Sequence, residues 1–423
     1  MKNVIFPRIL DNYEKGIKDE TFNGIKLQEI NQGVADAALN SIILELVIER
    51  KIDIISSETQ LNPHIKRHPP QPVDVQLKYF NILEKYHTCL YPTQETIATN
   101  LHLEFLDPRP FTKEIARGHH ELKPIFFEIG ALDRYRLDPR YHFNFSEYAG
   151  RISMSSETET SGPIPKRDQI SIQTFGLGID EDDNAVVCVF LRYLSQLSSE
   201  HQRHWESFVS VRPAKMHINY YKSSYLGNVF ENNSAIATIR IAINSINEVC
   251  EKVWGARLFV NSVPSDIHYN LSPFMRASES DYLIFVHELD KLISENINLK
   301  FFDGKVDPYT LVPHSDGLVE RKLKGTLTLL DEWLFEGDIH WRDAKTARRE
   351  VMQPFRKLRR ERQKPAHVTS QNKFSPKRTN ERREILGSTA FALANIMRML
   401  MKHPQSPIIK IPQWLQEGRI EVI

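Results

Sequence analysis

Apolar residues recur at helical spacing through the last third of the chain. The pattern predicts helices over about residues 280–296, 318–335, 343–363 and 379–402. In the second of these, Leu323, Leu327, Leu330 and Leu334 stand at i, i+4, i+7 and i+11. Since each segment carries one apolar stripe and the connections have roughly 7–20 residues, we expect an antiparallel four-helix bundle.

The pattern upstream of this region is mixed. Helical spacing runs over residues 25–50 and 73–89, and it returns over 233–254. Short β-favouring runs occupy 125–129, 141–145, 170–175 and 185–191, the last two flanking a turn-rich segment. The sequence therefore predicts an α+β protein with three parts: a helical accessory region over 1–97, a β-rich α+β middle domain over 98–275, and an all-α four-helix bundle over 276–423.

Composition sets outer limits on this picture. The 423 residues suit two or three domains, and a hydrophobic content of 41% can supply their cores. The three cysteines, Cys89, Cys188 and Cys250, lie far apart and include no CxxC pair, which argues against a disulfide framework or a cysteine-rich zinc site. The first ten residues lack the apolar segment of a signal peptide, and the longest apolar stretch, Ala185–Leu191, is far shorter than a membrane span. We expect a soluble, cytoplasmic protein.

Charge becomes informative on the third predicted helix of the bundle. Between Lys345 and Lys364 there are nine cations and two acids, nine minus two giving +7, in a chain whose net charge is +1. The cations are Lys345, Arg348, Arg349, Arg356, Lys357, Arg359, Arg360, Arg362 and Lys364. They could form a solvated face whose aliphatic stems cover the bundle. Because like charges one turn apart destabilise a helix, a polyanion-binding surface is the favoured interpretation.

The end of this helix places an arginine near a histidine. Pro365 disfavours helical geometry at Lys364, so the helix is expected to end near Gln363. Arg362 then lies on the last turn and His367 just beyond it, close enough for the two side chains to meet. A helix C-terminus also favours a protonated imidazole.

This segment, Arg-Gln-Lys-Pro-Ala-His over 362–367, resembles the HEPN superfamily of four-helix nucleases and nucleotide-binding modules. Active members carry an arginine, four to six residues and then a histidine near the end of the third helix; here four residues intervene. The phrase is most similar to the Apea-like branch, found in bacterial phage-defence proteins. The resemblance covers residues 278–405.

The resemblance implies a metal-independent endoribonuclease effector without a cofactor, as in bacterial phage-defence or toxin systems. His367 would act as general base or orienting group at a ribose 2′-hydroxyl, and Arg362 would stabilise the phosphoryl oxygens. The remaining candidates would hold the RNA backbone: Arg356, Lys357, Arg359, Arg360 and Lys364. It also implies a homodimer that pairs two Arg–His sites, with the upstream domains sensing a trigger or restraining the nuclease.

Two other functions compete with this one. The bundle could be a catalytically silent binder of RNA or nucleotide, or it could be only a dimerisation platform for a sensor in the middle domain. The arginine–histidine spacing also occurs at Arg136/His142, Arg212/His217, Arg360/His367 and Arg398/His403, so placement on the helix is what distinguishes Arg362/His367.

Other candidate sites are weaker. His64 and His68 could share a helix face and bind a metal, but nearby prolines favour a loop. His201 and His204 fall on an expected amphipathic helix, where packing and surface roles are favoured. Gly176 and Gly178 complete no phosphate-binding loop and no GxxxxGK[ST] motif occurs, so the sequence does not support dependence on ATP.

Overall fold

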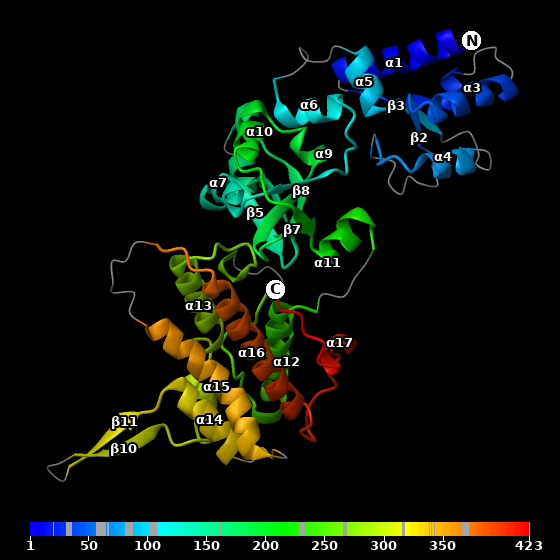
Figure 1. The fold of residues 1–423 in the computed structure, drawn as a ribbon. Helices are drawn as coiled ribbons and strands as arrows, with labels where there is room; N and C mark the ends of the chain where they lie inside the picture. The colour runs from blue at the N-terminus through cyan, green and yellow to red at the C-terminus, as the bar shows by residue number, and fades with distance from the viewer. Residues whose placement is uncertain are drawn as a thin grey trace. The chain divides into compact units, whose positions relative to one another are not determined.

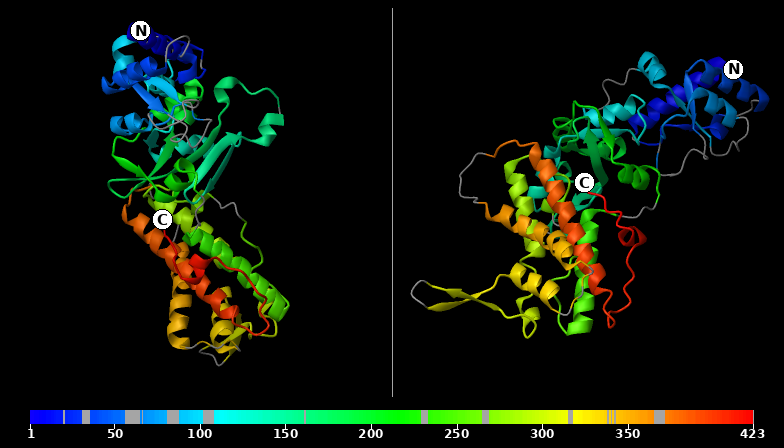
Figure 2. Two further views of the ribbon diagram at one scale, coloured as in Figure 1. Left: turned by 90° about the vertical axis from the view of Figure 1, so that its right-hand side faces the viewer. Right: turned by 60° about the horizontal axis from the view of Figure 1, so that its bottom comes forward.

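The computed structural model divides the chain into two compact units, residues 1–144 with 148–229, and residues 145–147 with 230–423. It describes all residues except 20, 31–35, 56–64, 66, 81–87, 102–107, 161, 229–232, 265–268, 315–317, 338, 340, 342, 365–371 and 423. Figure 1 traces the elements in chain order, and Figure 2 gives two further views.

The N-terminal part of the first unit holds a small antiparallel sheet with strand order β1-β3-β2. The strands are β1 (Ile25–Lys26), β2 (Ile52–Ile55) and β3 (Cys89–Pro92), surrounded by α1 (Lys2–Lys18), α2 (Leu27–Ile30), α3 (Asp36–Ile48), α4 (Val73–Phe80) and α5 (Gln94–Asn100). The region expected to be helical contains α1–α5 and, in addition, this small sheet. Residues 25–26 form a strand at the start of the expected helix 25–50. The expected helix 73–89 is described as α4 over 73–80, and its last residue, Cys89, begins β3, where Leu90 pairs with Ile54 in the core.

A six-stranded antiparallel sheet forms the middle of the first unit. Its order is β4-β8-β7-β6-β5, and β9 pairs with the end of β7. The strands are β4 (Pro124–Phe127), β5 (Tyr141–Ser146), β6 (Ala149–Met154), β7 (Ile172–Asp180), β8 (Ala185–Phe190) and β9 (Ala214–Met216). This confirms the expected β-rich region. The predicted runs 170–175 and 185–191 fall largely in β7 and β8, which pair with each other.

Strand β7 continues through most of the segment that the sequence marks as a turn. Gly176 lies inside the strand, and the ring of Tyr220 packs directly against it. A Cβ added at Gly176 would lie 2.1 Å from that ring. The glycine therefore permits close packing and does not mark a turn or a phosphate loop.

Short helices border the sheet within the first unit. They are α6 (Pro110–Ala116), η3 (Ile129–Leu132), α7 (Asp133–Leu137), α8 (Ser156–Thr160), η4 (Lys166–Asp168), α9 (Leu191–Leu194), α10 (Ser199–Glu206), α11 (Ile218–Tyr220) and η5 (Tyr221–Tyr225). Trp205 on α10 is fully buried and packs edge-on against Phe127 at 4.8 Å. Tyr13 of α1 donates to the backbone oxygens of Ile115 and Ala116 at 3.0 Å, so the N-terminal elements and the sheet region share one unit.

The second unit is helical. Its elements are α12 (Ala235–Trp254), η6 (Tyr269–Leu271), α13 (Glu279–Ile293), η7 (Leu299–Phe302), β10 (Tyr309–Pro313), β11 (Val319–Leu323), α14 (Thr326–Glu336), α15 (Ala344–Gln363), α16 (Lys377–Leu400) and α17 (Gln413–Gln416). Helices α12–α16 pack around one core, which confirms the expected C-terminal helical assembly. Among the described residues, no helix combines the length and apolar character needed to cross a bilayer.

Two boundaries differ from the sequence-based division. Helix α12 packs along α16 through a face that includes Ile239, Ile243 and Ile246, so it belongs to the helical unit although the division at 275 placed it upstream. The helix predicted over 318–335 was wrong in its first part. Residues 319–323 form β11 because β10 offers them a strand partner, and Gly325 is the N-cap from which α14 begins.

Candidate functional site

Helix α15 carries the candidate site. Residues of the helix and its caps determine where it begins, which side is buried and where it ends. Asp343 accepts a hydrogen bond from the backbone N–H of Thr346 at 3.1 Å, which caps the first turn. Four apolar side chains are buried in the core: Val351, Met352, Phe355 and Leu358. At the other end, the backbone N–H of Lys364 bonds to the carbonyls of Arg360 and Glu361. The helix thus ends where the proline was expected to end it.

The side of α15 opposite these apolar residues forms a continuous exposed row. We call it the outer stripe, and its members, spaced three or four residues apart, are Lys345, Arg349, Gln353, Arg356, Arg360 and Lys364. Five of the six are cations. Lys345, Arg349 and Arg360 form no ion pair with any described residue, so their charges are available to a ligand.

The first half of the outer stripe borders an open groove. It has a volume of about 400 Å³ and lies between α14 and α15. Its lining comprises Phe335, Ala344, Lys345, Arg348, Arg349, Gln353 and Arg356. Four cations and one amide on a single wall make this groove suited to an anionic ligand.

The remaining arginines of α15 face acids of neighbouring helices. Asp331 of α14 is buried and accepts from the Arg348 Nε at 2.7 Å, and it also pairs with Arg356 of the outer stripe. Asp290 of α13 is fully buried and pairs with Arg362 Nη1 at 2.6 Å and Arg359 Nε at 3.5 Å. Each aspartate therefore holds two arginines.

Arg362 is the most constrained cation at the end of the helix. Besides Asp290 it pairs with Glu295, and its side chain is 23% exposed. The hydrogen bond to Asp290 raises the pKa of the Arg362 guanidinium above its ordinary value. On the helical wheel Arg362 stands about 140° from Arg349, which directs it toward α13 rather than along the outer stripe.

Of the other predicted RNA-binding residues, some lie on the outer stripe and some pair with acids. Lys357 pairs with Glu384 of α16 at 2.5 Å, and Lys364 pairs with Glu361 at 2.6 Å. Arg359 belongs to the Asp290 cluster, whereas Arg356 and Arg360 lie on the outer stripe. His367 lies outside the described residues. The structure thus separates one exposed cationic row from a set of arginines fixed by buried carboxylates.

Sequence reasoning missed the acids that organise these arginines. Asp290 lies among Val286, Leu289 and Ile293 on the buried face of α13, and Asp331 lies beside Leu330 and Leu334 on that of α14. A lone acid on an apolar stripe is the signal that could have found them, because a buried carboxylate needs a cationic partner.

The described histidines among the weaker candidates, His68, His201 and His204, lie in packed surroundings. In α10, His201 is fully buried beside the Tyr135 hydroxyl at 2.9 Å, and burial lowers its pKa to about 4. His204 donates from Nε2 to the Ala131 carbonyl at 2.9 Å. His68 is buried, while His64 lies outside the described residues. Within the described part of the chain, no group of three potential metal ligands gathers.

The alternative arginine–histidine pairs also have ordinary partners. Arg398 donates to the Asn395 side chain at 3.2 Å, and the His403 ring lies tilted against Trp254 with the ring centroids 5.3 Å apart. Arg212 pairs with Asp182 at 2.7 Å. Arg136 pairs with Asp133 in the first turn of α7 at 2.8 Å. These contacts account locally for Arg136, Arg212 and Arg398.

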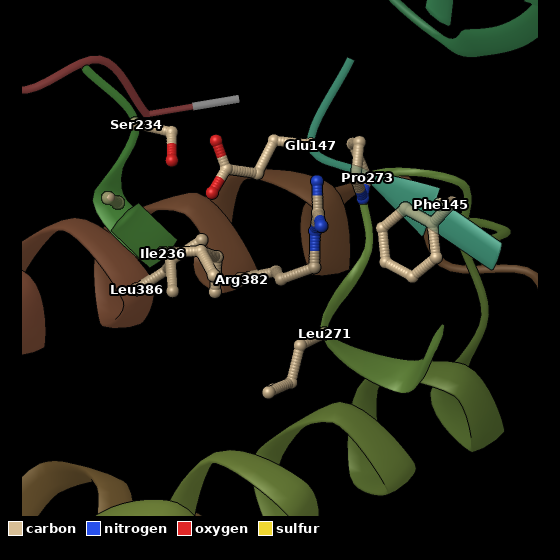
Figure 3. Close-up of a pocket in the computed structure, with 9 residues that line it drawn as sticks. Phe145, Glu147, Ser234, Ile236, Leu271, Pro273, Arg382 and Leu386 are labelled. Carbon is tan, nitrogen blue, oxygen red and sulfur yellow. The ribbon is translucent and has the colours of Figure 1, made fainter. Parts of the chain in front are cut away.

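A small pocket in the second unit surrounds Arg382 of α16 (Figure 3). Its volume is about 20 Å³, room for little more than one water molecule. Burial lowers the pKa of Arg382 to about 10, and its Nη1 donates to the Ser272 carbonyl at 2.9 Å. Phe145 and Glu147 contribute to the lining (Figure 3). The pocket is part of the packing and does not admit a ligand.

No family model, curated protein or solved structure matches the chain.

Proposed function

We propose that the second unit binds RNA, with the phosphate backbone lying along the outer stripe of α15. The observation that carries this proposal is the row of five exposed cations, three of which lack an ion pair among the described residues. Lys345 and Lys364 are 19 residues apart, so the row runs for about 28 Å. Its charges can contact several phosphates in succession, and Gln353 offers hydrogen bonds within the row.

The proposal is tested with a double charge reversal and a charge-matched control. Arg349→Glu with Arg360→Glu changes two free cations of the outer stripe. Lys252→Glu with Lys300→Glu changes two exposed lysines on α12 and η7 and alters the net charge equally. Affinity for a single-stranded RNA is measured across a salt series. Only the α15 variant should bind weakly, and the slope of log K against log salt should fall by about 1.4, since each phosphate contact contributes about 0.7. Equal losses of RNA affinity in both variants would show only a general effect of net charge and would contradict binding at the outer stripe.

A second candidate function is cleavage of the bound RNA at the end of α15. The observation in its favour is the fixed position of Arg362, which two carboxylates hold at the last turn of the helix. A guanidinium has five N–H donors, so Arg362 retains donors for a phosphate. Two residues stand between Lys364 and His367, so the three chain steps limit the distance between their Cα atoms to about 11 Å.

In this second candidate His367 removes the proton from a ribose 2′-hydroxyl, whose oxygen attacks the adjacent phosphorus. The bond to the 5′-oxygen of the next nucleotide breaks, and Arg362 stabilises the charge on the phosphoryl oxygens. The resemblance to HEPN proteins adds a cytoplasmic homodimer that brings two such helix ends together. The two carboxylates already at Arg362 instead favour the non-catalytic binder.

Arg362→Lys and His367→Ala separate the two candidates. Lysine keeps the charge beside Asp290 but loses the planar fork of donors, so a catalytic Arg362 would lose cleavage while the fold persists. Arg398→Lys, with its neighbour His403→Ala, is the matched control because the spacing is the same and the pair also closes a helix. Cleavage of a labelled RNA by the unaltered protein, lost in the first pair of variants alone, supports the nuclease. Binding without cleavage in every protein supports the binder.

A further inference from the structure

The β10–β11 hairpin is a two-stranded ribbon that projects from the helices of the second unit (Figures 1 and 2). Leu311 pairs with Arg321 at its middle, and Tyr309 pairs with Leu323 near its base. Among the described residues, no third strand joins the ribbon. Isolated two-stranded ribbons are marginally stable in water, whereas a third strand or a covering surface stabilises them.

The two faces of the ribbon differ in polarity. Because side chains alternate along a strand, one face carries Tyr309, Leu311, Pro313, Val319, Arg321 and Leu323. The other face carries Thr310, Val312, Glu320 and Lys322. Leu311, Val319 and Leu323 are 65%, 57% and 69% exposed. An apolar face open to solvent on a free ribbon is typical of an interaction surface.

The outer edge of β11 offers a complete row of backbone groups. The Lys324 N–H donates to the Pro308 carbonyl at 2.9 Å, and the His314 N–H donates to the Leu318 carbonyl at 2.8 Å. Hydrogen-bonded and non-bonded pairs alternate in antiparallel ribbons, so Val319, Arg321 and Leu323 direct their N–H and C=O groups outward. The outer edge of β10 is less suitable because Pro313 lacks an N–H.

We propose that β11 pairs antiparallel with β11 of a second copy of this chain, about a twofold axis at Arg321, to form a continuous four-stranded sheet. In this register Val319 lies opposite Leu323 of the partner subunit, and Glu320 lies opposite Lys322 of the partner subunit. The outward backbone groups of both copies then make about six hydrogen bonds.

The side chains select this register over its neighbours. Moving the axis to residue 320 places Glu320 against its own copy, and moving it to residue 322 places Lys322 against its own copy. Only the register centred on Arg321 pairs opposite charges at both symmetric positions. This register also places Arg321 opposite its own copy. Its guanidinium lies over the Tyr309 ring at 4.2 Å, so that charge is directed toward β10 and away from the axis.

A second copy fits this edge better than nucleic acid does. Glu320 separates the cations of the strand from the turn, and three of the five residues of β10 are apolar side chains in addition to a proline and a threonine. Phosphate binding depends on the number of cations that contact phosphates, and an acid within a short, largely apolar ribbon reduces it. The proposal does not depend on RNA binding or cleavage at α15.

The first experiment measures the oligomeric state of the full chain by sedimentation equilibrium. Glu320→Lys and Lys322→Glu each place like charges in opposition at two symmetric positions, and each should raise the dimer dissociation constant about tenfold or more. The double variant restores opposite charges and should restore dimerisation. Arg321→Pro removes an outward N–H and should also give a monomer, because that group does not bond to β10. Tryptophan fluorescence checks that each variant keeps its fold.

The second experiment tests the register by disulfide formation. Arg321→Cys should cross-link to itself, because the Cα atoms of two residues paired at the axis lie about 5.5 Å apart. Glu320→Cys and Lys322→Cys should cross-link efficiently only when the two variants are mixed. The native cysteines are buried and do not compete. A monomeric protein, a double charge variant that fails to recover, or charge variants that change RNA affinity but not mass would overturn the proposal.

Discussion

The two faces of α15 handle the same kind of residue in opposite ways. On the outer stripe, Lys345, Arg349 and Arg360 are exposed and have no ion-pair partner in the described part of the chain. On the inner side, Arg348, Arg359 and Arg362 contact the buried carboxylates Asp331 and Asp290. A charge of +7 over twenty residues therefore does not measure the charge offered to a ligand. The inner arginines stabilise the fold, whereas Lys345, Arg349 and Arg360 of the outer stripe are free to bind.

The largest effect expected from this comparison is at Arg362. Arg362→Ala leaves fully buried Asp290 with Arg359 alone, at 3.5 Å. A buried carboxylate that loses its closer partner costs about 3 kcal/mol of unfolding free energy. Four of the five tryptophans lie in the second unit, so urea unfolding followed by fluorescence reports mainly on it. Asp290→Asn should recover much of the loss when combined with Arg362→Ala.

The contrary result is informative. If Arg362→Ala leaves stability unchanged but weakens RNA binding as strongly as Arg360→Ala, then Arg362 belongs functionally with the outer stripe. The division between the two faces of α15 would then be wrong.

The next effect concerns Asp331, which keeps one arginine when the other is removed. Arg348→Ala or Arg356→Ala alone should lower the unfolding free energy by about 1 kcal/mol, because the side chains are 41% and 53% exposed. The double variant leaves the carboxylate of Asp331 unpaired and should cost about 3 kcal/mol, more than the sum. Strict additivity in this double-mutant cycle would show that the two arginines do not share Asp331 as a common anchor.

The sequence predicted more of the helices than of the contacts between them. The third helix was correct to within one residue at each end, because Asp343 caps it and Lys364 precedes a proline. The start of α14 was predicted eight residues before its observed start, because Leu323 continues the apolar spacing of the helix although it lies in β11. The spacing of apolar residues reports only local periodicity. A strand also requires a partner strand, and local periodicity does not reveal whether one is present.

The candidate site shows the same limit. The sequence located the cations of α15 and the helix end at Arg362, and helical geometry places Arg356, Arg360 and Lys364 on one side. It could not assign Arg359 and Arg362 to Asp290, which is 69 and 72 residues away in the chain. Pairings over such separations depend on how α13 and α15 pack, and the spacing of residues along one helix carries no record of that packing.

A smaller effect is expected at Lys357, which pairs with Glu384 at the surface. Their side chains are 37% and 65% exposed, so solvent screens the pair. Lys357→Ala should change the unfolding free energy by less than about 1 kcal/mol, and the change should shrink as salt is added. A salt-insensitive loss of larger size would indicate that the aliphatic stem of Lys357 packs against α16 and that its charge matters little.

The smallest effect on stability is expected on the outer stripe itself. Arg349→Ala and Arg360→Ala remove side chains that are exposed and have no ion pair with a described residue, so each should alter the unfolding free energy by no more than about 0.5 kcal/mol. The same substitutions should lower RNA affinity and reduce its salt dependence, because each removes a cation from the phosphate path. Compared with Arg362→Ala, these two variants should lose RNA affinity and keep stability, because the two properties depend on different faces of α15. Loss of stability at Arg349 or Arg360 without loss of binding would reverse the roles assigned to those faces.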